Sequence, residues 1–98
     1  MKTITTEEVL KKLDEGQEIH LIDVREPEET ATGKISIAQT IPLGTLEFHL
    51  DELDKNIEYI MVCRSGRRSA QATEFLEENG YKVTNMEGGM LAWEGPIE

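Results

Sequence analysis

Two short runs of mainly apolar residues constrain the fold of this chain more than any other feature. They are residues 19–24 (Ile-His-Leu-Ile-Asp-Val) and residues 59–63 (Tyr-Ile-Met-Val-Cys). Short apolar runs of this kind are typical of strands that are buried on both faces, as they are in a parallel sheet. The sequence therefore predicts a sheet that other elements cover on both sides.

Helical signals lie between the predicted strands. Thr5 and Glu8 form a capping-box pattern, and the helix that follows is expected to end at Gly16. Further helical segments are predicted over residues 46–53, 67–79 and 88–93, a short helix or turn at most over 28–33, and further strands over 40–43 and 81–86. Strands that alternate with helices favour an α/β domain with a mainly parallel sheet.

The composition fits one compact domain and excludes several kinds of partner. The 98 residues suit a single domain over 1–98, and 38% of them are hydrophobic, which argues against disorder. The formal net charge of −10 makes binding to nucleic acid or to an anionic membrane unfavourable. No apolar run approaches the roughly 20 residues that span a bilayer. Because nothing marks an oligomeric interface, we expect a soluble monomer.

The single cysteine provides evidence about the cellular compartment of the protein and about whether it binds a structural metal ion. It excludes an internal disulfide and is typical of a reducing compartment. Residues 1–8 contain acidic side chains and no apolar core, unlike a secretory signal. With His20 and His49, the cysteine makes a poor ligand set for structural zinc. We expect a cytoplasmic protein that uses no metal and no cofactor.

Cys63 is the last residue of the clearest predicted strand, and a loop and a helix follow it. Open parallel sheets bind their ligands at the carboxyl ends of the strands. The start of a helix adds positive potential there. Gly66 gives the loop the freedom to converge its amide groups on an anion. The arginines of this segment, Arg64, Arg67 and Arg68, add full positive charges nearby. Because such surroundings stabilise a thiolate, we predict a lowered pKa for Cys63.

Positive charge is concentrated in the same loop. Arg64, Arg67 and Arg68 are three of the four arginines in the chain, and residues 62–73 contain no acidic side chain. Guanidinium groups bind sulfate-like and phosphate-like anions through paired hydrogen bonds. A lone cysteine at a strand end is more often a small buried side chain, but its neighbours here favour an anion-binding loop.

Four segments resemble the motifs of single-domain rhodaneses, in the same order along the chain. Residues 63–69 (Cys-Arg-Ser-Gly-Arg-Arg-Ser) resemble the active-site loop of that family. Residues 21–28, 40–43 and 87–93 resemble its early strand motif, its second short strand and its C-terminal motif. The resemblance covers almost the whole chain. It implies a rhodanese-like three-layer domain in which helices flank a five-stranded parallel sheet.

The resemblance also implies transfer of sulfane sulfur from a donor such as thiosulfate to a thiophilic acceptor such as cyanide or a thiol. Cys63 would be the nucleophile and would carry the sulfur as a persulfide. Backbone amides of the loop would bind the outer sulfur, and the arginine side chains would attract the anionic donor. The residues concerned are Arg64, Ser65, Gly66, Arg67 and Arg68. A thiolate attacks sulfur directly, so this chemistry needs no general base.

One segment departs from the family pattern. Where members often have His-Ile-Pro-Gly-Ala, residues 34–38 are Lys-Ile-Ser-Ile-Ala. The missing Pro-Gly turn leaves open the local backbone and the access of substrate on that side.

Several other residues are interpreted as structural. We expect Asp23 and Arg25 to form an ion pair that fixes loops, Trp93 to anchor the core, and the acidic run 26–29 to be a solvated face. Gly88-Gly89 is too brief to be a phosphate-binding loop.

Other functions stay open on the sequence alone. A cysteine phosphatase or arsenate reductase has the pattern Cys-x5-Arg, but the sixth position after Cys63 is Ser69, and Arg68 stands at the fifth. A carrier domain would instead accept persulfide sulfur from one partner protein and pass it to another. A redox-sensor thiol is a further alternative, because cysteines with a low pKa are readily oxidised.

Overall fold

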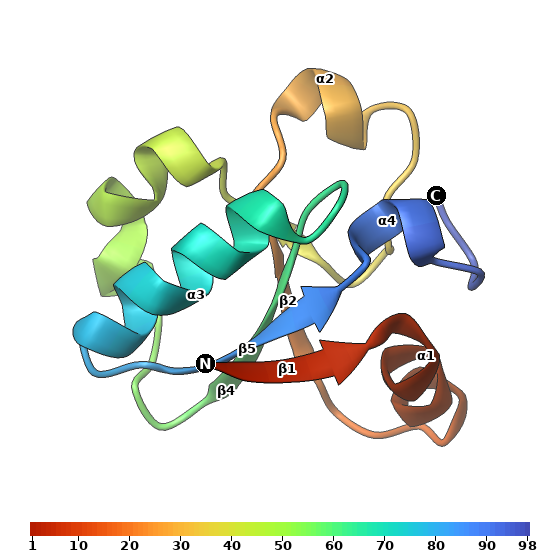
Figure 1. Ribbon diagram of the computed structural model, residues 1–98, viewed down its shortest axis with the longest axis horizontal. Coiled ribbons are helices and arrows are strands. Elements are labelled where there is room, and N and C mark those ends of the chain that lie inside the picture. Colours follow the sequence, from red (N-terminus) through yellow and green to blue (C-terminus); the bar gives the residue numbers. More distant parts are fainter.

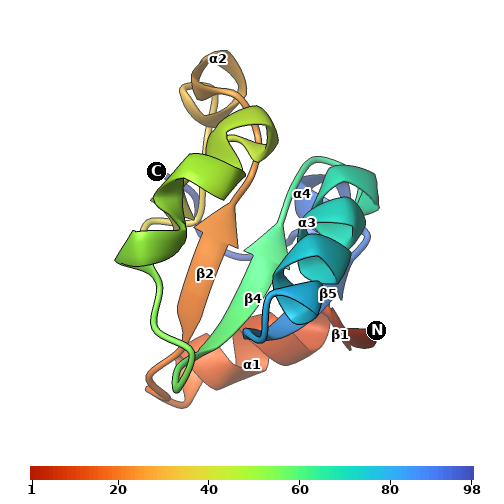
Figure 2. The same ribbon diagram turned by 90° about the vertical axis from the view of Figure 1, so that its left-hand side faces the viewer.

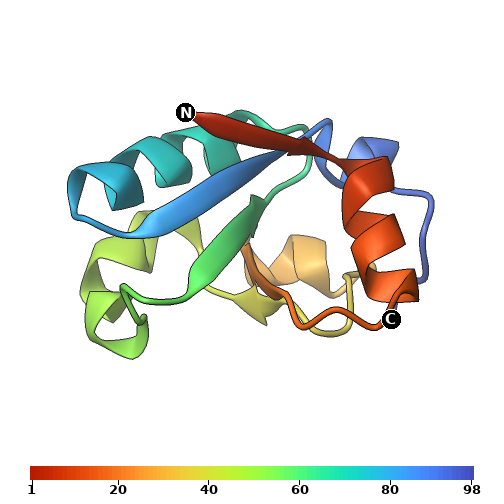
Figure 3. The same ribbon diagram turned by 90° about the horizontal axis from the view of Figure 1, so that it is seen from below.

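Five parallel strands form one sheet in the computed structural model, which describes residues 1–98. The strands are β1 (Lys2–Thr5), β2 (His20–Asp23), β3 (Gln39–Thr40), β4 (Glu58–Val62) and β5 (Lys82–Glu87). Their order across the sheet is β1-β5-β4-β2-β3, which places β5 between β1 and β4 (Figure 3). The expected α/β fold with a five-stranded parallel sheet is confirmed.

Helices cover both faces of this sheet. The helical elements are α1 (Thr6–Asp14), α2 (Pro27–Thr30), the 3-10 helix η1 (Leu43–Glu52), α3 (Arg67–Glu78) and α4 (Gly89–Ala92). Side chains of α3 and η1 pack on one face of the sheet, and those of α1 and α4 pack on the other (Figures 1 and 2). None of these helices has the length and the apolar character that a membrane-spanning segment requires.

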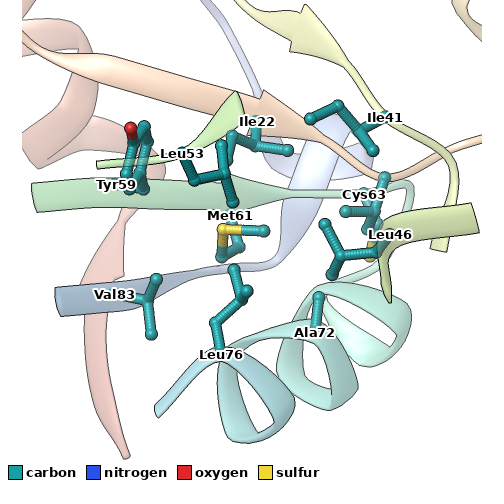
Figure 4. Close-up of a cluster of buried hydrophobic side chains, with 11 residues drawn as sticks. Ile22, Ile41, Leu46, Leu53, Tyr59, Met61, Cys63, Ala72, Leu76 and Val83 are labelled. Carbon is teal, nitrogen blue, oxygen red and sulfur yellow. The ribbon is translucent and has the colours of Figure 1, made fainter. Parts of the chain in front are cut away.

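The position of β4 in the middle of the sheet explains why its sequence is apolar throughout. Tyr59, Met61 and the following Cys63 face α3 and η1, where they belong to a cluster of 11 buried residues (Figure 4). Ile60 and Val62 belong to a second cluster, on the side of α1. Successive residues of a strand point to opposite faces. The predicted burial of this strand on both sides is therefore confirmed.

The first strand is an element that the sequence analysis did not predict. Residues 2–5 pair with β5, and only Ile4 among them is apolar. A mostly exposed strand at the edge of a sheet carries no apolar run, so its pattern is weak. The helix that follows does begin with the predicted capping box, in which Thr5 and Glu8 bond reciprocally.

The segment from residue 39 to residue 52 also differs from prediction. The strand expected over 40–43 is shorter and ends at Thr40. Pro42, which has no backbone N–H to donate, immediately precedes η1. The helix expected over 46–53 begins earlier, at Leu43, and is a 3-10 helix.

All five strands run in the same direction, so their carboxyl ends meet at one edge of the sheet. Figure 2 shows this direction for β2 and β4. The chain segments that follow β2, β4 and β5 all start at this edge, and α2 lies beyond it. Residues that are far apart in the sequence meet here.

Candidate active site

Cys63 lies where the sequence predicted, at the start of the loop between β4 and α3. The loop spans residues 63–66, because β4 ends at Val62 and α3 begins at Arg67. The Cys63 side chain is fully buried and close to Leu46 in the apolar cluster (Figure 4). The thiol is therefore at the carboxyl end of a central strand and at the amino end of a helix.

Two hydrogen bonds reach the sulfur of Cys63. The backbone amide of Gly66 donates to Sγ, with an N–S distance of 3.0 Å. The hydroxyl of Ser69 also donates to Sγ, with an O–S distance of 3.3 Å. Gly66 has a φ of +99°, a left-handed conformation that residues with a β-carbon rarely adopt. Glycine at this position therefore lets the loop turn its amide onto the sulfur.

These hydrogen bonds oppose the effect of burial on the thiol. Burial is the largest single influence, and it raises the pKa of Cys63 because it disfavours the charged form. The hydroxyl of Ser69 and the backbone amides of Ser69, Gly66 and Ser65 lower this pKa, and together they outweigh burial. The pKa of Cys63 is therefore lowered from its ordinary value, in the predicted direction. Hydrogen bonds cause the lowering, whereas the sequence analysis also invoked arginine charge.

Ser69 is a residue of the site that sequence analysis missed. It is fully buried in the first turn of α3, and its carbonyl oxygen accepts a hydrogen bond of 2.7 Å from the Thr73 hydroxyl. In the sequence analysis this serine belongs to the motif 63–69 and stands where a phosphatase-type loop has arginine, but it is given no role in the site. A serine in the first turn of a helix can point back toward the start of the preceding loop. This position in the sequence was the signal from which a hydrogen bond between Ser69 and Cys63 could have been predicted.

The three arginines in the loop and in the first turn of α3 have different surroundings. Arg64 and Arg67 are exposed. Arg68 forms a paired salt bridge with Glu29 of α2, with N–O distances of 2.6 and 2.7 Å. Hydrogen bonds from Arg68 are the main cause that lowers the pKa of Glu29 to about 2, so the pair is charged at neutral pH. The expectation that the run 26–29 is only a solvated face is wrong, because Glu29 binds Arg68 in the first turn of α3.

Asp23 and Arg25 form a second ion pair, which is buried. Arg25 Nη2 lies 2.8 Å from Oδ2 of Asp23, and Nε lies 3.0 Å from Oδ1. Their side chains are 0% and 6% exposed. Arg25 also donates to the carbonyl oxygens of Gly33 (3.0 Å) and Glu29 (3.5 Å). The pair therefore holds the segment after α2 against the sheet, which is the structural role predicted for it.

The carbonyl groups at the start of the loop are bound by α4. The amides of Met90 and Leu91 donate to the carbonyl oxygens of Cys63 (2.8 Å) and Arg64 (2.9 Å). A β-carbon at Gly89 would lie 2.5 Å from both of these oxygens. Glycine at this position is therefore needed for the close approach of α4 to the loop, a role that the sequence analysis did not foresee.

Asn85 of β5 binds the end of the same loop. Its side-chain Nδ2 donates to the carbonyl oxygen of Gly66 at 3.2 Å. Asn85 is 6% exposed, and its Oδ1 is buried without a hydrogen-bond partner. Nothing in the pattern of the predicted strand singled this residue out.

A cavity of about 560 Å³ lies beside the loop. Its walls come from α2 and the segment after it, from α4 and from the C-terminal tail, and they include Glu28, Arg64, Leu91, Trp93 and Ile97. Cys63 does not line this cavity, which reaches the loop through Arg64. Trp93 also packs against the apolar cluster on the side of α1, in agreement with its predicted role in the core.

The stretch that lacks the Pro-Gly turn packs away from the cavity. Ile35 and Ala38 are buried in the cluster on the side of α1. Lys34 exchanges two backbone hydrogen bonds with Glu98, at 2.8 and 3.3 Å. None of residues 34–38 lines the cavity, so this departure from the family pattern lies outside the cavity wall.

Comparisons with known proteins agree on one family. The model of the Rhodanese-like domain family matches residues 5–96. The "Putative sulfurtransferase YtwF" of Bacillus subtilis is 45% identical, over 97% of this chain and 92% of the relative. The "Sulfurtransferase" of Allochromatium vinosum is 35% identical, over 92% of this chain and 85% of the relative. A crystal structure of a rhodanese-like domain protein from Staphylococcus aureus is 47% identical, with a TM-score of 0.94 over 100% of this chain and 97% of that one.

Proposed function

The chain belongs to the rhodanese-like domain family, and we propose that it is a sulfurtransferase that carries sulfane sulfur as a persulfide on Cys63. The observation that carries this proposal is the set of hydrogen-bond donors around Sγ of Cys63. Because these donors lower the pKa of Cys63, a larger fraction of the thiol is present as the nucleophilic thiolate at a given pH. The relative from Allochromatium vinosum, which is named a sulfurtransferase, supports the same chemistry.

The proposed transfer consists of two displacements at sulfur. In the first, the Cys63 thiolate attacks the outer sulfur of thiosulfate, the S–S bond of thiosulfate breaks, and sulfite leaves with the electron pair. In the second, cyanide or a thiolate attacks the outer sulfur of the persulfide, and Cys63 leaves as a thiolate. Neither step needs a general base. The amide and hydroxyl donors stabilise negative charge on sulfur in both steps.

The surroundings of the thiol favour sulfur chemistry over phosphate or arsenate chemistry. A phosphatase-type loop uses the arginine six positions after its cysteine to close around an oxyanion. Here Ser69 occupies that position and donates to Sγ itself, while the neighbouring Arg68 is paired with Glu29. The loop therefore offers small donors that suit a single sulfur atom.

Mass spectrometry of the intact protein tests this proposal. After exposure to thiosulfate, the protein should gain one sulfur atom, about 32 Da. Cyanide should then remove that sulfur and form thiocyanate. The same protein incubated with an aryl phosphate should release no phenol. If neither thiosulfate nor a low-molecular-weight persulfide adds sulfur to the protein, the proposed function is wrong.

Replacing Ser69 by alanine should raise the pKa of Cys63. The variant loses the hydroxyl that lowers this pKa, while the burial that raises it remains. Because the thiolate reacts, sulfur uptake rises with pH up to the pKa and levels off above it. The rise should move to higher pH in the variant. At a pH below both pKa values, uptake should fall about tenfold if the pKa of Cys63 rises by one.

The rate of sulfur uptake from thiosulfate, measured against pH, checks this prediction. Ser36→Ala is a suitable control, because Ser36 is exposed and lies outside the loop. A pH profile of Ser69→Ala that matches the parent would exclude the role given to the hydroxyl.

Binding of an anionic sulfur donor should depend on Arg67. Glu29 should weaken this binding, because it pairs with Arg68. Arg67 is exposed beside the loop, so Arg67→Ala should raise the thiosulfate concentration for half-maximal rate by a few-fold at low salt. Glu29→Gln should lower that concentration, because it releases Arg68 from its carboxylate partner. High salt should reduce both differences. Parent-like values for both variants at low salt would mean that the arginines do not capture the donor.

One observation favours a reaction partner larger than thiosulfate. The cavity beside Arg64 has a volume of about 560 Å³, and the exposed side chains of Leu91 and Ile97 line it. It is large enough for part of a bulky persulfide donor or thiol acceptor. In this alternative function, the domain carries sulfur from one partner protein to another. A carrier would release its sulfur slowly to cyanide, whereas an enzyme of small molecules would turn over thiosulfate and cyanide many times.

A further inference from the structure

Three carbonyl groups of the loop that carries the donors to Sγ of Cys63 are bound by other elements of the fold. In a trans peptide unit, the carbonyl oxygen and the amide hydrogen point in opposite directions. A group that binds the carbonyl of one residue therefore determines where the N–H of the next residue points. This rule links the hydrogen bonds on the carbonyls of the loop to those on the sulfur.

The peptide unit that joins Arg64 to Ser65 illustrates the link. Its carbonyl accepts a hydrogen bond from the Leu91 amide at 2.9 Å. Its N–H belongs to Ser65, whose backbone amide is one of the groups that lower the pKa of Cys63. The preceding unit is bound in the same way, since the Cys63 carbonyl accepts from the Met90 amide at 2.8 Å. The N–H of Arg64 must therefore point away from α4.

Asn85 makes the third contact of this kind. It binds the carbonyl of Gly66, the residue whose own N–H donates to Sγ of Cys63. The amide of Ala70 also donates to this carbonyl, at 3.2 Å, so Asn85 and the first turn of α3 hold Gly66 together. The Asn85 Oδ1 is buried and without a partner, and such an atom destabilises a fold. An apolar side chain would therefore suit this position better if packing were its only role. The bond from Nδ2 to the loop is what accounts for an asparagine here.

We propose that Asn85 and Gly89 are positioning residues that aim the amides of the loop at the sulfur. Asn85 acts through the Gly66 carbonyl, and Gly89 acts by letting α4 reach the two carbonyls at the start of the loop. Neither residue touches the sulfur. Any side chain at Gly89 must push α4 off the loop, because its β-carbon would lie 2.5 Å from both oxygens. The expected effect on sulfur transfer rests on the proposed function, whereas the expected effect on the orientation of the loop amides does not.

Two variants with matched controls test the proposal. Asn85→Leu removes the donor at similar volume, and Thr84→Val, one residue earlier in β5, is its control. Gly89→Ala displaces α4. Its control is Gly16→Ala, because Gly16 has a φ of +72° and nothing lies within 4 Å of an added β-carbon there. The thiolate absorbance of Cys63, titrated against pH with Cys63→Ser as the blank, and the pH profile of sulfur uptake are the measurements.

We expect the pKa of Cys63 to rise in Asn85→Leu and in Gly89→Ala and to stay at the parent value in both controls. Sulfur uptake near neutral pH should fall in the two variants and recover at higher pH, which a loss of structure would not cause. Each variant tests the residue that it replaces. If one variant does not fold, the other still tests whether contacts on the loop carbonyls set the pKa of Cys63.

A parent-like pKa and a parent-like pH profile in a folded variant would overturn the positioning role of the residue replaced. The outcome for the proposed function is separate. If the parent takes up no sulfur but the pKa of Cys63 still rises in the variants, the sulfurtransferase function fails and the positioning role stands.

Discussion

Replacing Cys63 by serine should abolish sulfur transfer and leave the fold intact. Serine has nearly the same shape, but its hydroxyl stays protonated at neutral pH and is a poor nucleophile toward sulfur. We expect the gain of about 32 Da after thiosulfate to disappear and formation of thiocyanate to fall by about a thousandfold or more. Intact mass and a thiocyanate assay measure the two effects.

A loss of sulfur uptake in this variant can be assigned to one residue, because Cys63 is the only cysteine of the chain. No other thiol can take up the sulfur. Ser36→Ala, on the surface, is a matched control that should behave as the parent, and circular dichroism establishes that both variants are folded. Sulfur uptake by folded Cys63→Ser at the rate of the parent would refute the mechanism.

Replacing Asp23 by alanine should cause the largest loss of stability of any single change at the site. It leaves the Arg25 guanidinium buried without its carboxylate partner, since the two side chains are 6% and 0% exposed. Breaking one side of a buried ion pair costs about 3–5 kcal/mol in the free energy of unfolding. A domain has only about 5–15 kcal/mol in total, and each kcal/mol lowers Tm by about 4–8 °C at this size.

Thermal and urea unfolding measure this loss. Asp51→Ala, at an exposed position in η1, should change stability by less than about 0.5 kcal/mol. The double variant Asp23→Leu with Arg25→Met should recover part of the loss, because no unpaired charge is left. A loss below about 1 kcal/mol in Asp23→Ala would mean that water reaches Arg25 and replaces its partner.

Much of the scaffold could be predicted because it depends on neighbours in sequence. Burial of β4 on both faces leaves a run of apolar residues that needs no knowledge of the rest of the chain. The place of Cys63 followed from that run, and the turn at Gly66 followed from residue type. Strand β1 left no such trace, because one apolar residue among four mostly exposed positions is indistinguishable from a loop.

The parts of the site that were missed depend on contacts between distant residues. Glu29 and Arg68 are separated by 39 positions, so a run of acidic residues gave no hint that one of them binds an arginine next to the loop. Asn85 and Gly66 are separated by 19. Ser69 is close to Cys63 in sequence, but only the direction of its hydroxyl in the folded helix makes it a donor to the sulfur.

The dependence of the loop on residues 85–91 has a consequence for the newly made protein. A ribosome synthesises the cysteine well before the asparagine and the glycines that align the amides around it. Strand β5 also inserts between β1 and β4, so the first strand has no neighbour to pair with until β5 has emerged. During translation we therefore expect the thiol to keep an ordinary pKa until residues 85–91 have been added and have folded against the loop.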